Sequence, residues 1–290
     1  MTSVTYDWQL THDLDAFLAR AGDFLRSRPA RHTVALTVTE ALRRRGMRQY
    51  GESAPVFGTL ERDGAVRAAF FRTPPYRLNV TSLDERGAEG LAALLVDAGI
   101  EVPGISADQD TAEGFAAIWG RRTGARAELL RSERLYRLGG LTVPEPAPPG
   151  RPRIADEGDR DLLARWYTEF AESIAEGAHR DPGAWADDRI SYGGITLWEA
   201  PDGTPVAMAG VTPPVAGQLR VAPVYTPANL RGRGYAGAVT AEVSRAATAT
   251  GVQEVLLFTD LANPTSNGLY QRIGYRPVAG FATYDFTYDV

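Results

Sequence analysis

The stretch PANLRGRGYAGAVT, residues 227–240, decides the interpretation of the C-terminal half of this chain. Two arginines alternate with two glycines at the start of Arg231–Ala236, and a helix of small residues is predicted at 235–250. The first amide hydrogens of a helix have no partners within it, and they lie at the positive end of the helix dipole. Glycines let the backbone approach an oxygen atom closely, and arginines add positive charge. The loop therefore predicts a site for a pyrophosphate.

The same loop also matches the dinucleotide-binding pattern G-x-G-x-x-G, through Gly232, Gly234 and Gly237, with Asp260 as the acidic residue. In that pattern the glycines directly follow the first strand. Here residues 226–231 separate them from the preceding predicted strand, and too little chain follows for a doubly wound sheet. A dinucleotide fold is therefore disfavoured, while a glycine-rich turn that merely starts a helix remains an alternative.

A pattern of Asp-Gly followed by Thr-Pro-Pro occurs in each half of the chain. Asp63-Gly64 precedes Thr73-Pro74-Pro75, and Asp202-Gly203 precedes Thr212-Pro213-Pro214 at the same spacing. Each Asp-Gly pair separates two apolar runs, which predicts a β-hairpin because glycine adopts a positive φ without steric cost. The two halves are therefore candidates for copies of one unit.

A second repeated motif and a proline-rich segment complete this organisation. RRTGAR at 121–126 and QRIGYR at 271–276 each follow a predicted helix and precede a predicted strand. Between the halves, VPEPAPPGRP predicts a stiff, extended linker. We therefore expect a mixed α/β chain of two duplicated units, with domains at 1–143 and 153–290 and the linker at 144–152.

The composition limits the available chemistry. The 290 residues include no Cys and no Lys, which excludes disulfides, thiolate nucleophiles and a lysine Schiff base. The three His residues lack metal-ligand spacing, so we expect no metal site. The net charge of −5 argues against a nucleic-acid partner. Without a long apolar run or a signal-peptide pattern at the N-terminus, we expect a cytoplasmic protein with no membrane partner.

The order of motifs in the second half resembles the GCN5-related N-acetyltransferase (GNAT) family. A strand precedes Arg231-x-x-Gly234-x-Ala236 and a helix; a strand and a second helix follow, and the second helix carries Tyr270 before Ile273-Gly274-Tyr275. The resemblance is close over 220–280 and general over 150–290. It implies two tandem GNAT-like units, each a central, mostly antiparallel sheet flanked by helices.

The resemblance also implies how an acyl donor would bind. Backbone amides of Arg231–Ala236 would hold the pyrophosphate of acetyl-CoA, and the strand at Val224 and Tyr225 would present amides to its pantetheine and thioester. Asn263 and Ser266 are further donor-binding candidates, although Asn before Pro264 also predicts a helix N-cap. The residues implied in donor binding are Val224, Tyr225, Arg231, Gly232, Arg233, Gly234, Tyr235, Ala236, Asn263 and Ser266.

Tyr270 occupies the family's position for the acid that protonates the departing thiolate. A packed helix aromatic is the alternative interpretation of this residue. The strand LRVAPVYT contains no acidic residue, so the sequence identifies no general base. In the first half, no Arg-x-x-Gly-x-Ala follows Thr73-Pro74-Pro75, and aligning the repeated motifs puts Gly120 opposite Tyr270. The N-terminal half therefore resembles a degenerate copy.

We expect an N-acetyltransferase that moves an acetyl group from acetyl-CoA to a small-molecule amine by direct attack. Two alternatives remain: a non-catalytic acyl-CoA-binding or regulatory module, and an acyltransferase that uses a longer acyl-CoA or a carrier-bound donor. Glu169, Glu172 and Glu176 lie on one face of a predicted helix near the expected acceptor site. A solvated helix surface is the simpler explanation of this face, and the alternative hypothesis is that it concentrates a cationic amine acceptor.

Overall fold

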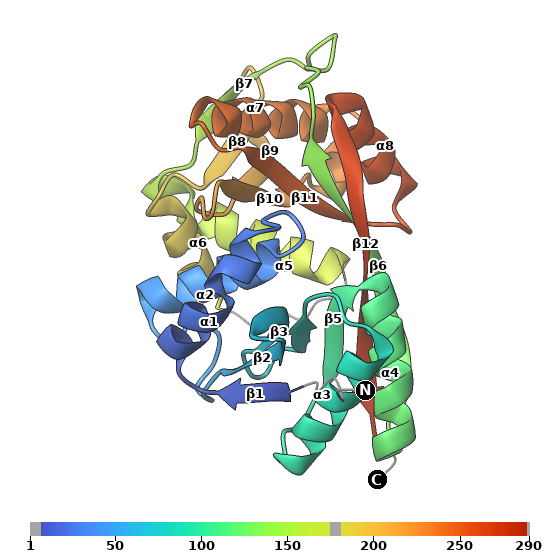
Figure 1. Ribbon diagram of the computed structural model, residues 1–290. Coiled ribbons are helices and arrows are strands. Elements are labelled where there is room, and N and C mark those ends of the chain that lie inside the picture. The colour runs from blue at the N-terminus through green and yellow to red at the C-terminus, as the bar shows by residue number, and fades with distance from the viewer. Residues whose placement is uncertain (1–6, 175–180, 289–290) are drawn as a thin grey trace. The chain divides into compact units, whose positions relative to one another are not determined.

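The structure is a computed structural model that describes residues 7–174 and 181–288 (Figure 1). The chain forms two compact units. Unit 1 comprises Met1–Leu135, Asp260–Ala262 and Val278–Val290, and unit 2 comprises Tyr136–Thr259 and Asn263–Pro277. The expected domains, 1–143 and 153–290, differ from these units at 136–143, which belong to unit 2, and at 260–262 and 278–290, which belong to unit 1. No helix in the described residues is long and apolar enough to cross a membrane.

Two repeats of the same element order make up the described chain, which confirms the predicted duplication of an α/β unit. The first repeat contains β1 (Asp7–Thr11), α1 (Leu14–Arg26), α2 (Thr33–Arg45), β2 (Val56–Arg62), β3 (Ala65–Arg72), β4 (Leu78–Val80), α3 (Glu85–Asp97), β5 (Gly104–Asp108), α4 (Gln109–Thr123) and β6 (Arg126–Leu138). The second contains β7 (Arg151–Ile154), α5 (Arg160–Ser173), α6 (Pro182–Ile190), β8 (Ile195–Glu199), β9 (Pro205–Val211), β10 (Gln218–Tyr225), α7 (Tyr235–Ala249), β11 (Glu254–Asp260), α8 (Pro264–Ile273) and β12 (Tyr275–Thr287). Short 3₁₀ turns, η1 (Glu157–Asp159) and η2 (Ala228–Leu230), precede α5 and α7.

Both predicted Asp-Gly hairpins are present. Asp63 and Gly64 have φ values of 54° and 72° between β2 and β3, as a two-residue turn of mirror-image type requires. Between β8 and β9 only Gly203 has a positive φ, 85°, while the Asp202 carboxylate accepts a hydrogen bond from the Thr204 amide. The same dipeptide thus makes two different tight turns.

In unit 1 the strand order is β1-β2-β3-β4-β5-β12, and all of these pairs are antiparallel except the parallel pair β4-β5. Phe281–Asp285 of β12 pair with Gly104–Asp108 of β5. Arg77 forms an ion pair with Asp285, and Trp119 donates a hydrogen bond to the Tyr288 hydroxyl at 3.0 Å. The last strand of the second repeat is therefore fixed in unit 1.

In unit 2, β7, β8, β9 and β10 are antiparallel neighbours and β11 lies parallel to β10. Side chains alternate along β9: Ala207 and Ala209 pack in the same cluster as α7, whereas Met208 packs with α5 and α6. This alternation puts α5 and α6 on one face of the sheet and α7 and α8 on the other.

The proline-rich linker is fixed to unit 2 at both ends. The Thr142 amide donates to the Ile273 carbonyl at 2.7 Å, and the Trp198 indole donates to the Pro149 carbonyl at 3.2 Å. Pro144 and Pro148 are half-buried, while the residues between them are exposed. The linker therefore lies along unit 2 as a bound segment.

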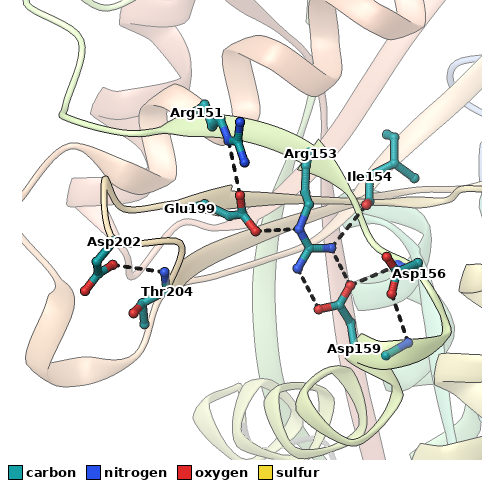
Figure 2. A network of polar contacts seen from close by, with 9 residues as sticks. Arg151, Arg153, Ile154, Asp156, Asp159, Glu199, Asp202 and Thr204 are labelled. Atoms are coloured by element: carbon teal, nitrogen blue, oxygen red, sulfur yellow. Dashed lines mark hydrogen bonds and ion pairs between the residues drawn. The ribbon is translucent and has the colours of Figure 1, made fainter.

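A polar network around Arg153 joins the edge strand β7 to its surroundings (Figure 2). The Arg153 guanidinium donates to Asp159 at 2.5 and 2.8 Å and to Glu199 at 2.5 Å. Arg151 also donates to Glu199, over a longer distance of 3.3 Å. The hydrogen bonds from Arg153 hold the pKa values of both carboxyl groups below their usual range. One arginine thus connects β7 with β8 and with the start of α5.

Replacing Arg153 with Met should lower the melting temperature by about 5 °C at pH 7, because two buried carboxylates lose their main partner. Both carboxyl pKa values are depressed in the folded state, so the stabilisation is present above the unfolded pKa of about 4. It is lost as the pH falls through the lower folded pKa values. Thermal melts from pH 7 to pH 3 should therefore show the difference between wild type and Arg153→Met shrinking in acid.

Arg151→Met is the matched control, because the Arg151 side chain is 79% exposed and that of Arg153 is 30% exposed. This variant should melt within about 1 °C of wild type. Equal losses in the two variants would contradict the assigned role of Arg153.

Candidate active site

The two parallel strands at the centre of unit 2 separate along their length. β10 and β11 pair only at Gln218–Arg220 with Glu254–Leu256 among the described residues. Beyond Arg220 the backbone of β10 is paired to β9 alone. The part of β10 that ends at Tyr225 therefore has an edge facing β11 that can form hydrogen bonds with an extended molecule, as an added strand would.

A β-bulge accompanies this separation. Val221 pairs with Val211 and Val224 with Ala209, so β10 has one more residue than β9 between these pairs. A methyl group at Gly210 would lie 2.6 Å from the Ala222 carbonyl oxygen, so only glycine fits opposite the bulge. Bulges bend a strand and increase its twist, which is the local reason that β10 turns away from β11.

The loop between β10 and α7 is shaped by two glycines in the left-handed region. Gly232 has a φ of 77° and Gly234 one of 84°, while Arg231 has a φ of −66°. Arg231 is extended, with a ψ of 161°, and turns that contain left-handed residues can direct backbone amide hydrogens toward one anion. Gly234 is the N-cap of α7, and no side chain caps this helix or places an acidic group in its first turn.

The side chains of both loop arginines are held by loop carbonyls. Arg231 Nε donates to the Thr226 carbonyl at 3.0 Å, and Arg233 Nη2 donates to the Asn229 carbonyl at 3.2 Å. Both residues are exposed. Each arginine therefore braces the loop and keeps its positive charge beside the open amides.

The bound linker borders the same loop. A methyl group at Gly234 would lie 3.8 Å from Pro148, and one at Gly237 would lie 3.5 Å from Pro144. The two half-buried linker prolines thus contact the start of α7. The segment that joins the two repeats is a wall of this candidate site.

The equivalent helix start in the first repeat has opposite chemistry. α3 follows β4, as α7 follows β10, but its N-cap is Asp84, whose carboxylate accepts from the Gly87 amide at 2.8 Å. Glu85 adds a second acid in the first turn. A carboxylate occupies the position where unit 2 has open amides, and it would repel a phosphate.

Tyr270 lies on α8 and is 8% exposed. Its ring meets Tyr275 edge-on at 6.1 Å, and it packs in the cluster on the α7 and α8 face of the sheet. Burial raises the pKa of the Tyr270 hydroxyl to about 12, and no hydrogen bond to the described part of the chain contributes to this value. The hydroxyl is therefore protonated at neutral pH.

Asn263 and Ser266 lie at the start of the helix that carries Tyr270. The Asn263 amide oxygen caps α8 by accepting from the Ser266 amide at 3.0 Å, and Pro264 is its first residue, as predicted from the sequence. Ser266 is half-buried and lies one turn before Tyr270 on the same side of the helix.

A tyrosine from the first repeat, which sequence reasoning missed, orients α8. Tyr136, at the end of β6, donates its hydroxyl proton to Asn267 at 2.9 Å and accepts from Gln271 at 3.0 Å. Tyr136 is buried, and it belongs to unit 2 although β6 is the last strand of the first repeat. Its partners lie 131 and 135 residues away, so no local pattern could indicate the contact.

A second missed contact brings an acid to the end of β10. The Tyr225 hydroxyl donates to Glu169 Oε2 of α5 at 2.6 Å, and the Tyr225 ring packs 6.0 Å from that of Trp166. Burial and the nearby Glu169 carboxylate raise the pKa of Tyr225 to about 12, while the charge of Arg231 opposes them. Of the other acids on the predicted face, Glu172 is exposed and Glu176 lies outside the described residues.

No group of three or more acidic or histidine side chains is placed to hold a metal ion in residues 7–174 and 181–288. The described site consists of backbone amides, tyrosine hydroxyls, one carboxylate and arginines. These groups can bind a polyanion, bind an extended amide chain and transfer protons.

Comparisons with known proteins agree with this geometry. Residues 160–275 match the family described as Acetyltransferase (GNAT) family. A GCN5-related N-acetyltransferase from Sphaerobacter thermophilus is similar in structure, with a TM-score of 0.64 and 19% identity over 97% of this chain and 96% of that one. An acetyltransferase of the GNAT family from Colwellia psychrerythraea has a TM-score of 0.61 and 10% identity over 97% and 100% of the two chains.

A further solved structure is described as a tandem GNAT protein from the clavulanic acid biosynthesis pathway. It has a TM-score of 0.55 and 10% identity, and the similarity covers 96% of this chain and 98% of that chain. Among curated proteins there is no match. At these identities the structural similarity establishes the fold. Residues 160–275 therefore match the model of the acetyltransferase (GNAT) family, and the chain has the fold of two tandem GNAT-like units.

Proposed function

We propose that unit 2 transfers an acetyl group from acetyl-CoA to a small-molecule amine by direct attack. The observation that carries the proposal is the uncapped start of α7, which follows a loop with two left-handed glycines and lies after the separated end of β10. The pyrophosphate of the donor would accept hydrogen bonds from amides of Arg231–Ala236. Its pantetheine amides would pair with the open edge of β10 near Val224.

The reaction needs two further contributions from the protein. Backbone amides at the end of β10 would stabilise the negative charge that develops on the thioester oxygen when the amine attacks. Tyr270 would then give its hydroxyl proton to the departing thiolate. The phenol is protonated at neutral pH, as a proton donor must be.

In this proposal, unit 1 does not bind acetyl-CoA. Its α3 start is closed by Asp84, and β4 has three residues where β10 has eight. We therefore treat the first repeat as a degenerate copy whose role is structural. The proposal further places the reaction in the cytoplasm, with no metal, nucleic acid or membrane involved.

A non-catalytic acyl-CoA-binding module is the second candidate, and the absence of an acid within β10 favours it. The two candidates share donor binding and differ in turnover. A longer or carrier-bound acyl donor would leave the roles of the loop and of Tyr270 unchanged.

Calorimetric titration with acetyl-CoA should give one binding site per chain, because of the two equivalent helix starts Asp84 closes that of α3 and no side chain caps that of α7. Gly234→Asp would add a negative charge beside the open amides at the start of α7, and donor affinity should fall at least about 100-fold. Gly234→Asn has the same size and the same left-handed backbone conformation but no charge, so its loss should be about tenfold smaller. Two sites per chain, or equal affinity in these two variants, would contradict the proposed donor site.

Tyr270→Phe should lower kcat for the acetylation of an amine by about 10- to 100-fold, because the thiolate loses its proton donor. The affinity for acetyl-CoA should stay within twofold of wild type in calorimetry. Release of free CoA thiol from acetyl-CoA, measured over a panel of primary amines, provides the assay.

Tyr275→Phe is the control for this substitution, since Tyr275 is buried and its hydroxyl is hydrogen-bonded to Ser244 at 2.7 Å. It should affect thermal stability and leave kcat close to wild type. Acetyl-CoA binding without turnover of any amine by the wild-type protein would favour the non-catalytic module.

A further inference from the structure

A carboxylate from α5 lies at the end of β10, although β10 itself contains no acidic residue. Glu169 comes from α5, and its Oε2 accepts the 2.6 Å hydrogen bond from Tyr225, the last residue of β10. Glu169 is half-buried. Its other oxygen, Oε1, makes no hydrogen bond or ion pair with residues 7–174 or 181–288. One carboxylate oxygen is thus fixed and the other is available.

This carboxylate lies on the opposite face of the sheet from Tyr270. Tyr225 and Trp166 belong to the cluster on the α5 and α6 face, whereas Tyr270 packs with α7 and α8. A thioester bound along the open edge of β10 would lie between these two faces. An acid on one side and a base on the other is the arrangement that an amine attack and a thiolate departure require.

The contact between Tyr225 and Glu169 restricts the position of the carboxylate. The Tyr225 ring is held 6.0 Å from Trp166, one turn before Glu169 on α5, so ring and carboxylate share one helix face. Arg231, from the donor loop, lies close enough to Tyr225 to lower its pKa. The Tyr225 side chain therefore lies close to Arg231 of the donor loop and contacts Glu169 and Trp166 of α5.

We infer that Glu169 is the catalytic base for the acceptor, that it binds the ammonium group of a primary amine, and that Tyr225 positions it. The inference rests on the proposed acetyl transfer. Glu169 Oε1 takes one proton from the ammonium and passes it to solvent, and the amine nitrogen attacks the thioester carbon. The new C–N bond forms, the C–S bond breaks, and the thiolate takes the proton of Tyr270. The remaining excess proton on the nitrogen restores the Tyr270 hydroxyl. The products are one amide, one thiol and one released proton.

Glu169→Gln tests this assignment with little change in shape, because the Gln carbonyl oxygen can accept the same hydrogen bond from Tyr225. Its kcat/KM for butylamine should fall about 100- to 1,000-fold, with the affinity for acetyl-CoA within twofold of wild type. The loss should become much smaller with methoxyamine, which is already neutral at the assay pH and needs no base.

Three further variants separate a catalytic role of Glu169 from a structural one. Glu172→Gln changes an exposed acid three residues further along α5 and should behave as wild type. Tyr225→Phe should lower kcat about tenfold with little change in KM, since the carboxylate is present but no longer oriented. Glu169→Ala should recover part of its activity when formate is added, which a purely structural residue would not allow.

The outcomes distinguish this inference from the proposed function. Failure of the wild-type protein to bind acetyl-CoA in calorimetry would overturn both. Binding of acetyl-CoA together with Glu169→Gln activity within threefold of wild type would overturn the base alone. The same holds if the loss is equal for butylamine and methoxyamine. Acetyl-CoA binding without turnover of any amine by wild type would overturn both the acetyl transfer and the base, and it would leave only the donor site.

Discussion

One extra residue in β10 sets the geometry on which the rest of unit 2 depends. The bulge between Val221 and Val224 bends the strand, and the parallel partner β11 pairs with it only as far as Arg220. Gly210 makes this possible because no side chain would fit beside the Ala222 carbonyl. The separated strand ends at Tyr225, from which the chain leads directly into the loop and the uncapped start of α7. The open edge of β10, the amides of the loop and the positive end of the α7 dipole therefore follow one another along a single stretch of backbone.

The two repeats show how small changes decide whether a helix start can hold an anion. α3 and α7 occupy the same place in their repeats, but Asp84 satisfies an amide of α3 with a negative charge. In the other repeat Gly234 leaves the amides of α7 open, and neighbouring arginines supply positive charge. The fold is common to both repeats, so the difference in proposed function arises from a few residues at one loop.

The first repeat still contributes to the second. Tyr136, from the last strand of the first repeat, is bonded to two residues of α8 on either side of Tyr270 along the chain. The linker that follows contacts α7 through Pro144 and Pro148. In the other direction, β12 of the second repeat completes the sheet of unit 1 beside β5. Each repeat thus contributes a segment to the compact unit formed mainly by the other.

The sequence by itself determined the elements and the family. Asp-Gly turns, a proline-rich linker, the Asn263-Pro264 helix start and the loop Arg231–Ala236 are local signals, because each depends on the φ preference or the capping chemistry of adjacent residues. Only the tertiary structure decided which sheet β12 joins, that Tyr136 orients α8, and that Glu169 meets Tyr225 across 56 residues. These contacts depend on packing between distant segments, and a strand or a carboxylate has the same local sequence pattern whichever partner it meets.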